Sequence, residues 1–590
     1  MKKWISIAFG VFLIGAATTV ASADGATCQV TLSDANATGT SGDKSLSDCI
    51  GELTDGDTVT FADDVTTVVF SDEIGFEKSL TIDGQIATGR VEFDLNDNKA
   101  FTVTNSDKLL TLRNLDISEG KTASDATGAD LDGGSVRVGG DLALENVSFS
   151  DSSAPGLSNT GGRGGAAYVS GDLSLSGEIN VTGNGSLDNG AVFYVVGEVS
   201  SVGLTLIAEN NESSGGFGGV FYTDNDITLN GSVTSTTNQA LSGGFAYTFG
   251  ALNITGDLLA NGDDARPGQA GSIWASSLTV GGNLTASENT ALGNGGFAVI
   301  TGPVIVTGDL EATGNRSSLG SGGFLSATSL TVDGDLTADN NIAYLDGGFA
   351  DLSGGLEVKG SITATDNIAS NRNGGFIDAA SLTVDGGIVS TGNEAHLNGG
   401  FADLSGAFTA GGAITAKNNL ANNGDGGFVK SAAISFAGGL FEDNSAFANG
   451  GVFSTTSSVT ATGPIQESRN EASGSEGGFI DATGDVTLVS LESDSSSSFG
   501  LGGSINTGSN VVITGSVSAS VTRSLNSGGG VIYSSGNTEI GSLYANGTSS
   551  LSVGSVIQAI GEITVSGSSV ISNVSGERAL DGTLGVTLDS

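Results

Sequence analysis

Apolar residues return to the same place every 26 positions through the middle of the chain, in parallel columns. One column runs through Leu252, Leu278, Val304, Leu330, Leu356, Leu382, Phe408 and Ile434. A second runs through Leu258, Leu284, Leu310, Leu336, Ile362, Ile388, Ile414 and Leu440. A unit this short cannot bury its own apolar face, so neighbouring copies bury it by stacking. The spacing therefore predicts a solenoid.

Within each unit the apolar residues alternate with polar ones, which indicates short strands. Helices are disfavoured because 96 of the 590 residues are glycine, without the regular period of collagen. One turn is expected to contain three strands, at 329–332, 335–339 and 347–351. The prediction is an all-β, right-handed parallel β-helix of about 20 turns, with about 26 residues per turn.

A column of asparagines keeps the same step and falls five residues after the second apolar column. Asparagine tolerates bends, and stacked side-chain amides can hydrogen-bond from one turn to the next. We expect a structural ladder rather than a ligand site, formed by Asn289, Asn315, Asn341, Asn367, Asn393 and Asn419.

The first residues resemble a cleaved secretory signal, with Lys2 and Lys3, an apolar stretch and a small-residue site at 21–23. The expected organisation is a signal peptide (1–23), an N-terminal cap (24–70), the β-helix (71–575) and a C-terminal tail (576–590). The product is expected to be exported, extracellular or associated with the cell surface or outer membrane. No later apolar run is long enough to cross a membrane as a helix.

Cys28 and Cys49 are the two cysteines of the chain, and both lie in the expected cap. In an oxidising compartment two such cysteines are expected to form a disulfide. A metal pair is the weaker alternative, because a closed site needs about four ligands and the chain has one histidine.

The formal net charge of −45 excludes a nucleic-acid reader, for which a basic surface is expected. Acidity spread along a rod keeps it soluble. No cofactor or metal site is predicted. Calcium bridging between carboxylates stays open, although neither calcium-binding loop motif is present.

Two motifs resemble the repeats of polymorphic outer membrane proteins and related autotransporter passengers. These are the glycine pair, here followed by phenylalanine at Gly322-Gly323-Phe324, and the motif Phe441-Glu-Asp-Asn444. The resemblance covers most of the chain and implies a β-helix used for surface adhesion or display. Such proteins end in a membrane β-barrel, but the β-helix pattern here persists to about Ile571, so we expect a passenger without its own translocator.

The strand after each glycine pair carries an inward apolar column, and alternation places its neighbours outside. The candidate outer binding face is therefore Phe297, Phe324, Phe349, Phe376, Phe401, Phe428, Tyr194, Tyr222, Tyr247 and Trp274. The alternative is that the strand bends at the glycines and the phenylalanine rings turn into the core. An exposed row would forgo roughly 1.5–3 kcal/mol per ring and would mark a partner surface.

An enzyme is the second hypothesis, a polysaccharide lyase or glycoside hydrolase on a pectate-lyase-like β-helix. Asp351, Asp378 and Asp403 stack at the strand spacing, which matches carboxylate separations used by glycosidases. The lone His396 and the insertion at 262–268, with Asp263 and Asp264, are weaker candidates. The basic clusters that bind an anionic substrate are missing.

A non-catalytic adhesin or surface structural protein is the preferred function. Its partners are a glycan or protein receptor on a host or neighbouring cell. A third hypothesis is a self-assembling surface coat, in which rods associate laterally through the phenylalanine column. No catalytic residue is assigned under the preferred reading.

Overall fold

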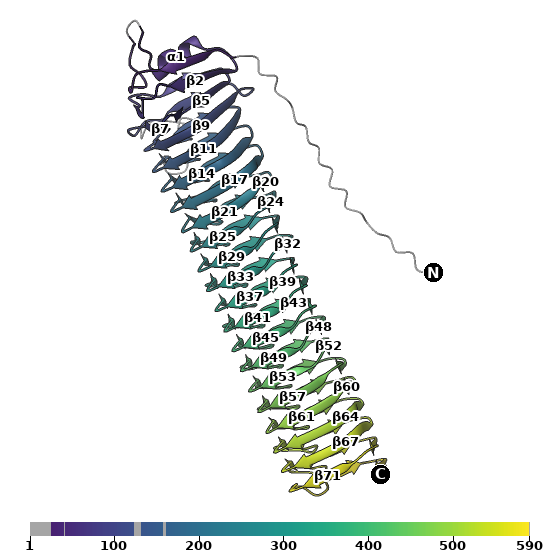
Figure 1. Ribbon diagram of the computed structural model, residues 1–590. Helices are drawn as coiled ribbons and strands as arrows, with labels where there is room; N and C mark the ends of the chain where they lie inside the picture. Colours follow the sequence, from purple (N-terminus) through teal and green to yellow (C-terminus); the bar gives the residue numbers. More distant parts are fainter. Residues whose placement is uncertain (1–24, 40–41, 123–130, 157–160, 589–590) are drawn as a thin grey trace.

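The computed structural model describes residues 25–39, 42–122, 131–156 and 161–588. Within these ranges the chain forms one long rod of about 20 stacked turns, built of strands and a single helix (Figure 1). The expected signal peptide lies outside the described residues. The predicted parallel β-helix is confirmed.

Most turns contribute to three sheets. The first two run along the whole described rod, and the third extends from β12 (Ser153–Ala154) to β68 (Ser549–Ser550). In one turn, β36 (Ser329–Val332) and β37 (Leu336–Asp339) belong to the first sheet, of 37 strands. The two-residue β38 (Ile342–Ala343) belongs to the third sheet, of 16 strands, and β39 (Ala350–Leu352) to the second. The sequence predicted three strands per turn and missed β38, because two residues are too few to show alternation.

Strands pair in parallel with their counterparts in the next turn. Leu330 faces Leu356, and Leu336 faces Ile362, as the 26-residue step requires. These side chains are at most 1% exposed and fill the interior. Because one turn cannot exclude water from its own apolar side chains, the stacking of turns supplies most of the burial.

The second apolar column does not include its predicted last member, Leu440. In β53 (Gly439–Glu442), Gly439 rather than Leu440 pairs with Ile414 of β49 (Ile414–Lys417), and Leu440 pairs with the outward Thr415. The reason is a one-residue deletion, since Asn419 and Asn444 are 25 residues apart instead of 26. A slip of one residue reverses the face of every side chain. Leu440 therefore leaves the core, Gly439 takes its column position, and the fully buried Phe441 stands in register with Ala416.

The asparagine column forms a ladder inside the bends. Each side-chain Nδ2 donates to the Oδ1 of the next asparagine at 2.9–3.1 Å, and all six side chains are buried. Asn341 Nδ2 also donates to the carbonyl of Ala312 at 2.8 Å. These bonds satisfy buried polar groups that would otherwise destabilise the bend. The ladder extends beyond the predicted members to Asn184, Asn211, Asn238, Asn444 and Asn470.

The N-terminal end is covered by α1 (Leu46–Glu52), which packs beside β1 (Thr27–Val30) and β2 (Asp57–Phe61). A disulfide joins Cys28 of β1 to Cys49 of α1, with Cα atoms 5.4 Å apart. Ser45 and Asp48 form a reciprocal capping box that starts the helix. The helix buries Leu46 and Ile50 over the first turn.

The stacking continues where a tail was expected. β72 (Leu580–Gly582) pairs with β69 (Ile557–Ala559), and β73 (Gly585–Leu588) pairs with β70 (Glu562–Val565). The predicted boundary at residue 575 is therefore wrong. β72 and β73 are only three and four residues long, so alternation alone did not reveal them.

Replacement of Asn341 by alanine tests the ladder. The variant removes the acceptor of the Asn315 backbone N–H and the side-chain donor to the carbonyl of Ala312, so we expect a local loss of about 2–4 kcal/mol. Hydrogen exchange of residues 312–367 should accelerate by at least about tenfold. The exposed Asn371→Ala is the matched control and should change little. Equal exchange in both variants would contradict a stabilising ladder.

Candidate functional site

The six phenylalanines that were expected outside are all inside the rod. Phe297, Phe324, Phe349, Phe376, Phe401 and Phe428 are 0% exposed. Their assignment to an outer binding face is therefore wrong, and the alternative in which the glycines turn the rings inward holds. These six residues are called the phenylalanine stack.

The glycine pair explains the inward turn. Gly322 has φ +66°, and Phe324 is the last residue of the bend, because β35 (Leu325–Ala327) begins one position later. Alternation starts only with the strand, so Phe324 and Leu325 both point inward. The next glycine is also required, since a Cβ on Gly323 would lie 2.0 Å from the carbonyl of Gly348.

Rings of the phenylalanine stack lie face to face between turns. Their centroids are 4.8–5.0 Å apart and their planes are within 20° of parallel. This spacing is close to the distance between paired strands, so the backbone imposes it. Each of the four inner rings, Phe324, Phe349, Phe376 and Phe401, therefore lies between two phenylalanine rings.

The outward tyrosines and Trp274 form a second, separate stack on the surface of the second sheet. They come from β13 (Ala167–Val169), β16 (Phe193–Val195), β19 (Phe221–Thr223), β23 (Ala246–Thr248) and β27 (Ile273–Ala275). Centroid distances along Tyr168, Tyr194, Tyr222, Tyr247 and Trp274 are 4.6–5.8 Å. Each residue is half-buried. Ring faces cover one another, which leaves ring edges toward solvent.

Two phenylalanines widen this surface beyond the predicted residues. Phe217 stacks on Tyr247 at 4.6 Å. Phe249 meets Tyr247 and Trp274 edge-on at 5.5 and 5.2 Å, and 54% of it remains exposed. Sequence reasoning missed both because neither recurs in the next turns, and only recurring positions were aligned.

Arg163 closes the other end of the surface stack. Its guanidinium carbon lies 4.9 and 4.8 Å from the ring centroids of Tyr168 and Tyr194, within the range of cation–π contacts. Its Nη2 also donates to the buried Asp132 at 2.7 Å, and this bond raises the pKa of Arg163. We call Arg163, Tyr168, Tyr194, Phe217, Tyr222, Tyr247, Phe249 and Trp274 the aromatic strip.

Burial raises the pKa of Tyr194, Tyr222 and Tyr247 above the ordinary tyrosine value. Their hydroxyls therefore stay protonated at physiological pH. Tyr222 donates to Asp224 at 3.3 Å, and Tyr194 accepts from Arg163 at 3.5 Å. The rings of the aromatic strip are therefore uncharged. The charged groups that contact them are Arg163 and Arg137 at the Tyr168 end and Asp224 beside Tyr222.

The aspartates considered for catalysis do lie side by side. Asp351 pairs with Asp378, and Asp378 with Asp403, on successive strands of the second sheet. Burial raises the pKa of Asp351 to about 6. Burial, followed by repulsion from Asp403, raises the pKa of Asp378 to about 7. Stacking in register forces like charges together, which disfavours full ionisation.

A polar ladder that the sequence reasoning missed runs beside these aspartates. Asn398 Nδ2 donates to Asn373 Oδ1 at 3.1 Å, and Asn449 Nδ2 donates to Asp425 Oδ1 at 3.1 Å. Backbone amides of Asn373 and Asp425 complete it by donating to Asp346 and Asn398. The signal was available, because each member directly precedes a glycine pair.

Asp263 and Glu467 are carboxyl groups buried in the rod and held by hydroxyl donors. Asp263 stands in the asparagine ladder and accepts from the hydroxyls of Ser235 and Ser272 at 2.6 and 2.7 Å. Burial raises its pKa to about 6. Glu467 is similarly enclosed, accepting from Ser504 at 2.9 Å and from Ser496. Asp263 was predicted in a protruding loop, and the structure gives it an interior, structural position instead.

The other residues that the sequence suggested for catalysis, Asp264 and His396, make only local contacts. Arg266 and Asp264 form a local ion pair at 3.0 Å. His396 contacts Asn423 on an exposed bend. Over the described ranges, no three His, Cys, Asp or Glu side chains gather as a metal site requires. No helix in the described residues has the length and apolarity of a membrane crossing.

Phe349→Ser tests the interior position of the phenylalanine stack. Loss of a ring buried between two others should cost about 3–5 kcal/mol and lower the thermal midpoint. Circular dichroism melting of the full chain measures it. A variant as stable as the parent would place the ring outside.

Asp378→Asn tests whether a charge on the buried, stacked aspartates destabilises the rod. Its pKa of about 7, against the ordinary 3.8, means that its stabilising contribution is present below about pH 4 and is lost as pH rises toward 7. The neutral amide should raise the thermal midpoint at pH 8 and leave it unchanged at pH 4.

Asp339→Asn, on the outer face of the first sheet, removes the same charge and is the matched control. We expect the change in thermal midpoint to depend more strongly on pH for Asp378→Asn than for this control. Equal effects at both pH values would contradict the burial argument.

The chain was compared with protein-family models, with curated proteins and with solved structures. None of the three comparisons finds a match. The likeness to polymorphic outer membrane proteins therefore rests on the motifs quoted above, and the β-helix rests on the structure.

Proposed function

We propose that this protein is an exported, non-catalytic rod that binds a receptor on another cell through the aromatic strip. It would act as an adhesin or as a surface structural protein. The observation that supports the proposal is the gathering of seven aromatic rings and Arg163 on one outer strip, with Phe249 54% exposed. Export is proposed from the signal-like residues 1–23, and the Cys28–Cys49 disulfide agrees with an oxidising compartment.

The composition of the aromatic strip is that of an interface hot spot. Tryptophan, tyrosine and arginine dominate the binding energy of protein interfaces. The stacked rings are already held in place, so binding loses little side-chain entropy. Ring faces are covered by neighbours, and the most exposed ring is Phe249. This geometry favours a protein receptor with an apolar pocket for Phe249 over a glycan that needs an open ring face.

The overall charge bears on which surfaces the rod can approach. A net charge of −45 repels acidic surfaces at distances within the Debye length. The rings of the aromatic strip are uncharged, Arg163 is paired with Asp132, and the other charges that contact the rings, Arg137 and Asp224, are of opposite sign. Apolar contact rather than charge attraction would therefore provide the affinity, which should depend weakly on salt.

Polysaccharide cleavage is the second candidate. It is favoured by one observation, the half-protonated state that a pKa of about 7 gives Asp378 beside Asp351 and Asp403 near neutral pH. An acid and a base at this separation match glycoside hydrolysis. The third hypothesis was lateral assembly through the phenylalanine column. The phenylalanine stack is interior and offers no surface for such an assembly.

Phe249→Ser tests the proposed function. The ring is more than half exposed, so the fold should persist while affinity for receptor-bearing cells falls more than about tenfold. Binding of the purified chain to cells is measured by flow cytometry, with melting as the check on folding.

Phe447→Ser is the matched control, because Phe447 is 56% exposed but lies outside the aromatic strip. It should bind like the parent. Equal binding by both variants would contradict the proposed site. Release of reducing or unsaturated sugar in the same samples, abolished by Asp378→Asn, would instead support the enzyme.

A further inference from the structure

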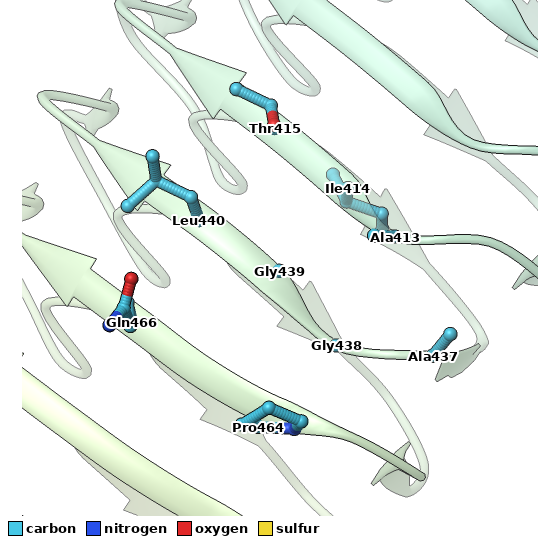
Figure 2. Close-up of a pocket in the computed structure, with 9 residues that line it drawn as sticks. All are labelled: Ala413, Ile414, Thr415, Ala437, Gly438, Gly439, Leu440, Pro464 and Gln466. Atoms are coloured by element: carbon cyan, nitrogen blue, oxygen red, sulfur yellow. The ribbon is translucent and has the colours of Figure 1, made fainter.

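The one-residue deletion between Asn419 and Asn444 leaves a groove on the outer face of the first sheet. It has a volume of about 460 Å³. Figure 2 shows Thr415, Leu440 and Gln466 side by side at one end, and Ala437 and Pro464 at the other. Its lining is Ala413, Ile414, Thr415, Ala437, Gly438, Gly439, Leu440, Pro464 and Gln466.

The floor of the groove is bare backbone and cannot be filled from within. Gly438 and Gly439 have φ of +116° and +156°. A Cβ on Gly439 would lie 2.1 Å from the carbonyl of Ile414, and one on Gly438 would lie 2.6 Å from the carbonyl of Pro464. The shortened bend therefore requires two glycines, and the floor of the groove carries no side chain at these two positions.

The register slip also changes what the groove displays. Leu440 would be a core residue in a regular turn, but here it pairs with Thr415 and Gln466 on the outer face. Partial exposure of a leucine forgoes part of the roughly 1.5–3 kcal/mol of its burial. A ligand that covers the leucine would recover this free energy.

The chemistry of the lining selects an uncharged ligand. None of the nine lining residues is ionisable, although the chain carries a net charge of −45. Apolar surface comes from Leu440 and Pro464, and hydrogen-bonding groups come from Thr415 and Gln466. The Gln466 amide nitrogen donates to Glu492 at 3.1 Å, so its oxygen faces a ligand as an acceptor. The side chain of Glu492 would repel an anionic ligand.

Surroundings of the groove favour a hydroxyl-rich polymer. Thr409, Ser435 and Thr460 lie in register on the outer face of the three adjoining strands, β48 (Ala407–Ala410), β52 (Ala433–Phe436) and β56 (Val459–Ala461). A chain that leaves the groove would meet this row of hydroxyls. A pyranose ring combines an apolar C–H face with a rim of hydroxyls, which matches both the groove and its border.

We propose that the groove binds one uncharged pyranose unit of a glycan chain. Its volume lies within the range of about 300–1,000 Å³ found for small-molecule sites. The groove is on the first sheet, roughly six turns from Trp274 on the second sheet. The inference therefore does not depend on the function proposed for the aromatic strip.

Calorimetry and saturation-transfer NMR of the full chain test the proposal with defined probes. These are the neutral hexaoses of maltose, cellulose, laminarin and chitin type, with hexagalacturonate as the anionic comparison. At least one neutral hexaose should bind with Kd below about 1 mM, and hexagalacturonate should not. The proposal is overturned if no neutral hexaose binds at about 10 mM, or if the anionic one binds equally.

Thr415→Trp fills the groove from its rim, where the fold tolerates a larger side chain, and should weaken binding at least about tenfold. Gln466→Ala, on an exposed position, should weaken it by loss of one acceptor. Thr363→Trp is the matched control, two turns earlier in the same outward column, and should bind normally.

Unchanged affinity in both groove variants would place the sugar elsewhere and overturn the proposal. Phe249→Ser separates the two proposals, because it should leave oligosaccharide affinity intact while it reduces cell binding. If Phe249→Ser loses cell binding and no hexaose binds the parent chain, the groove proposal is contradicted and the proposal for the aromatic strip is not.

Discussion

Parallel pairing between turns is the constraint on which the whole rod depends, because it sets each side chain on its counterpart one turn away. A side chain that interacts favourably with a copy of itself therefore stabilises the rod when it recurs at the same position in successive turns. Amides such as Asn341 and Asn367 bond at 2.9 Å, and rings such as Phe349 and Phe376 stack at 4.9 Å. A carboxylate that recurs in successive turns is destabilised instead, because burial and then repulsion from Asp403 raise the pKa of Asp378.

Recognition sites should then lie where the repetition is broken. The aromatic strip departs from the pattern through Phe217 and Phe249, which have no counterparts in the adjacent turns. The groove arises from a single missing residue that carries Leu440 from the interior to the surface. Both departures leave the backbone pairing intact, so a stable scaffold displays two different surfaces on two sheets.

The 26-residue period was enough to predict the β-helix, its inward columns and the asparagine ladder, since each follows from stacking identical turns. It failed where one residue changed the register or the local geometry. Alternation could not place Phe324, because the ring belongs to the bend before the strand. Nor could it place Leu440, because the deletion is visible only against the asparagine step. Partners that do not recur from turn to turn, such as Ser272 for Asp263, carry no periodic signal at all.

The most direct measurement is hydroxyl-radical footprinting of the native chain, read by mass spectrometry at each phenylalanine. The account predicts that the phenylalanine stack is protected, whereas Phe249 and Phe447, at 54% and 56% exposure, are oxidised rapidly. Oxidation of Phe349 or Phe376 at the rate of Phe249 would contradict it. In that case the rings would be a surface, and the assignment of recognition to the aromatic strip would fail.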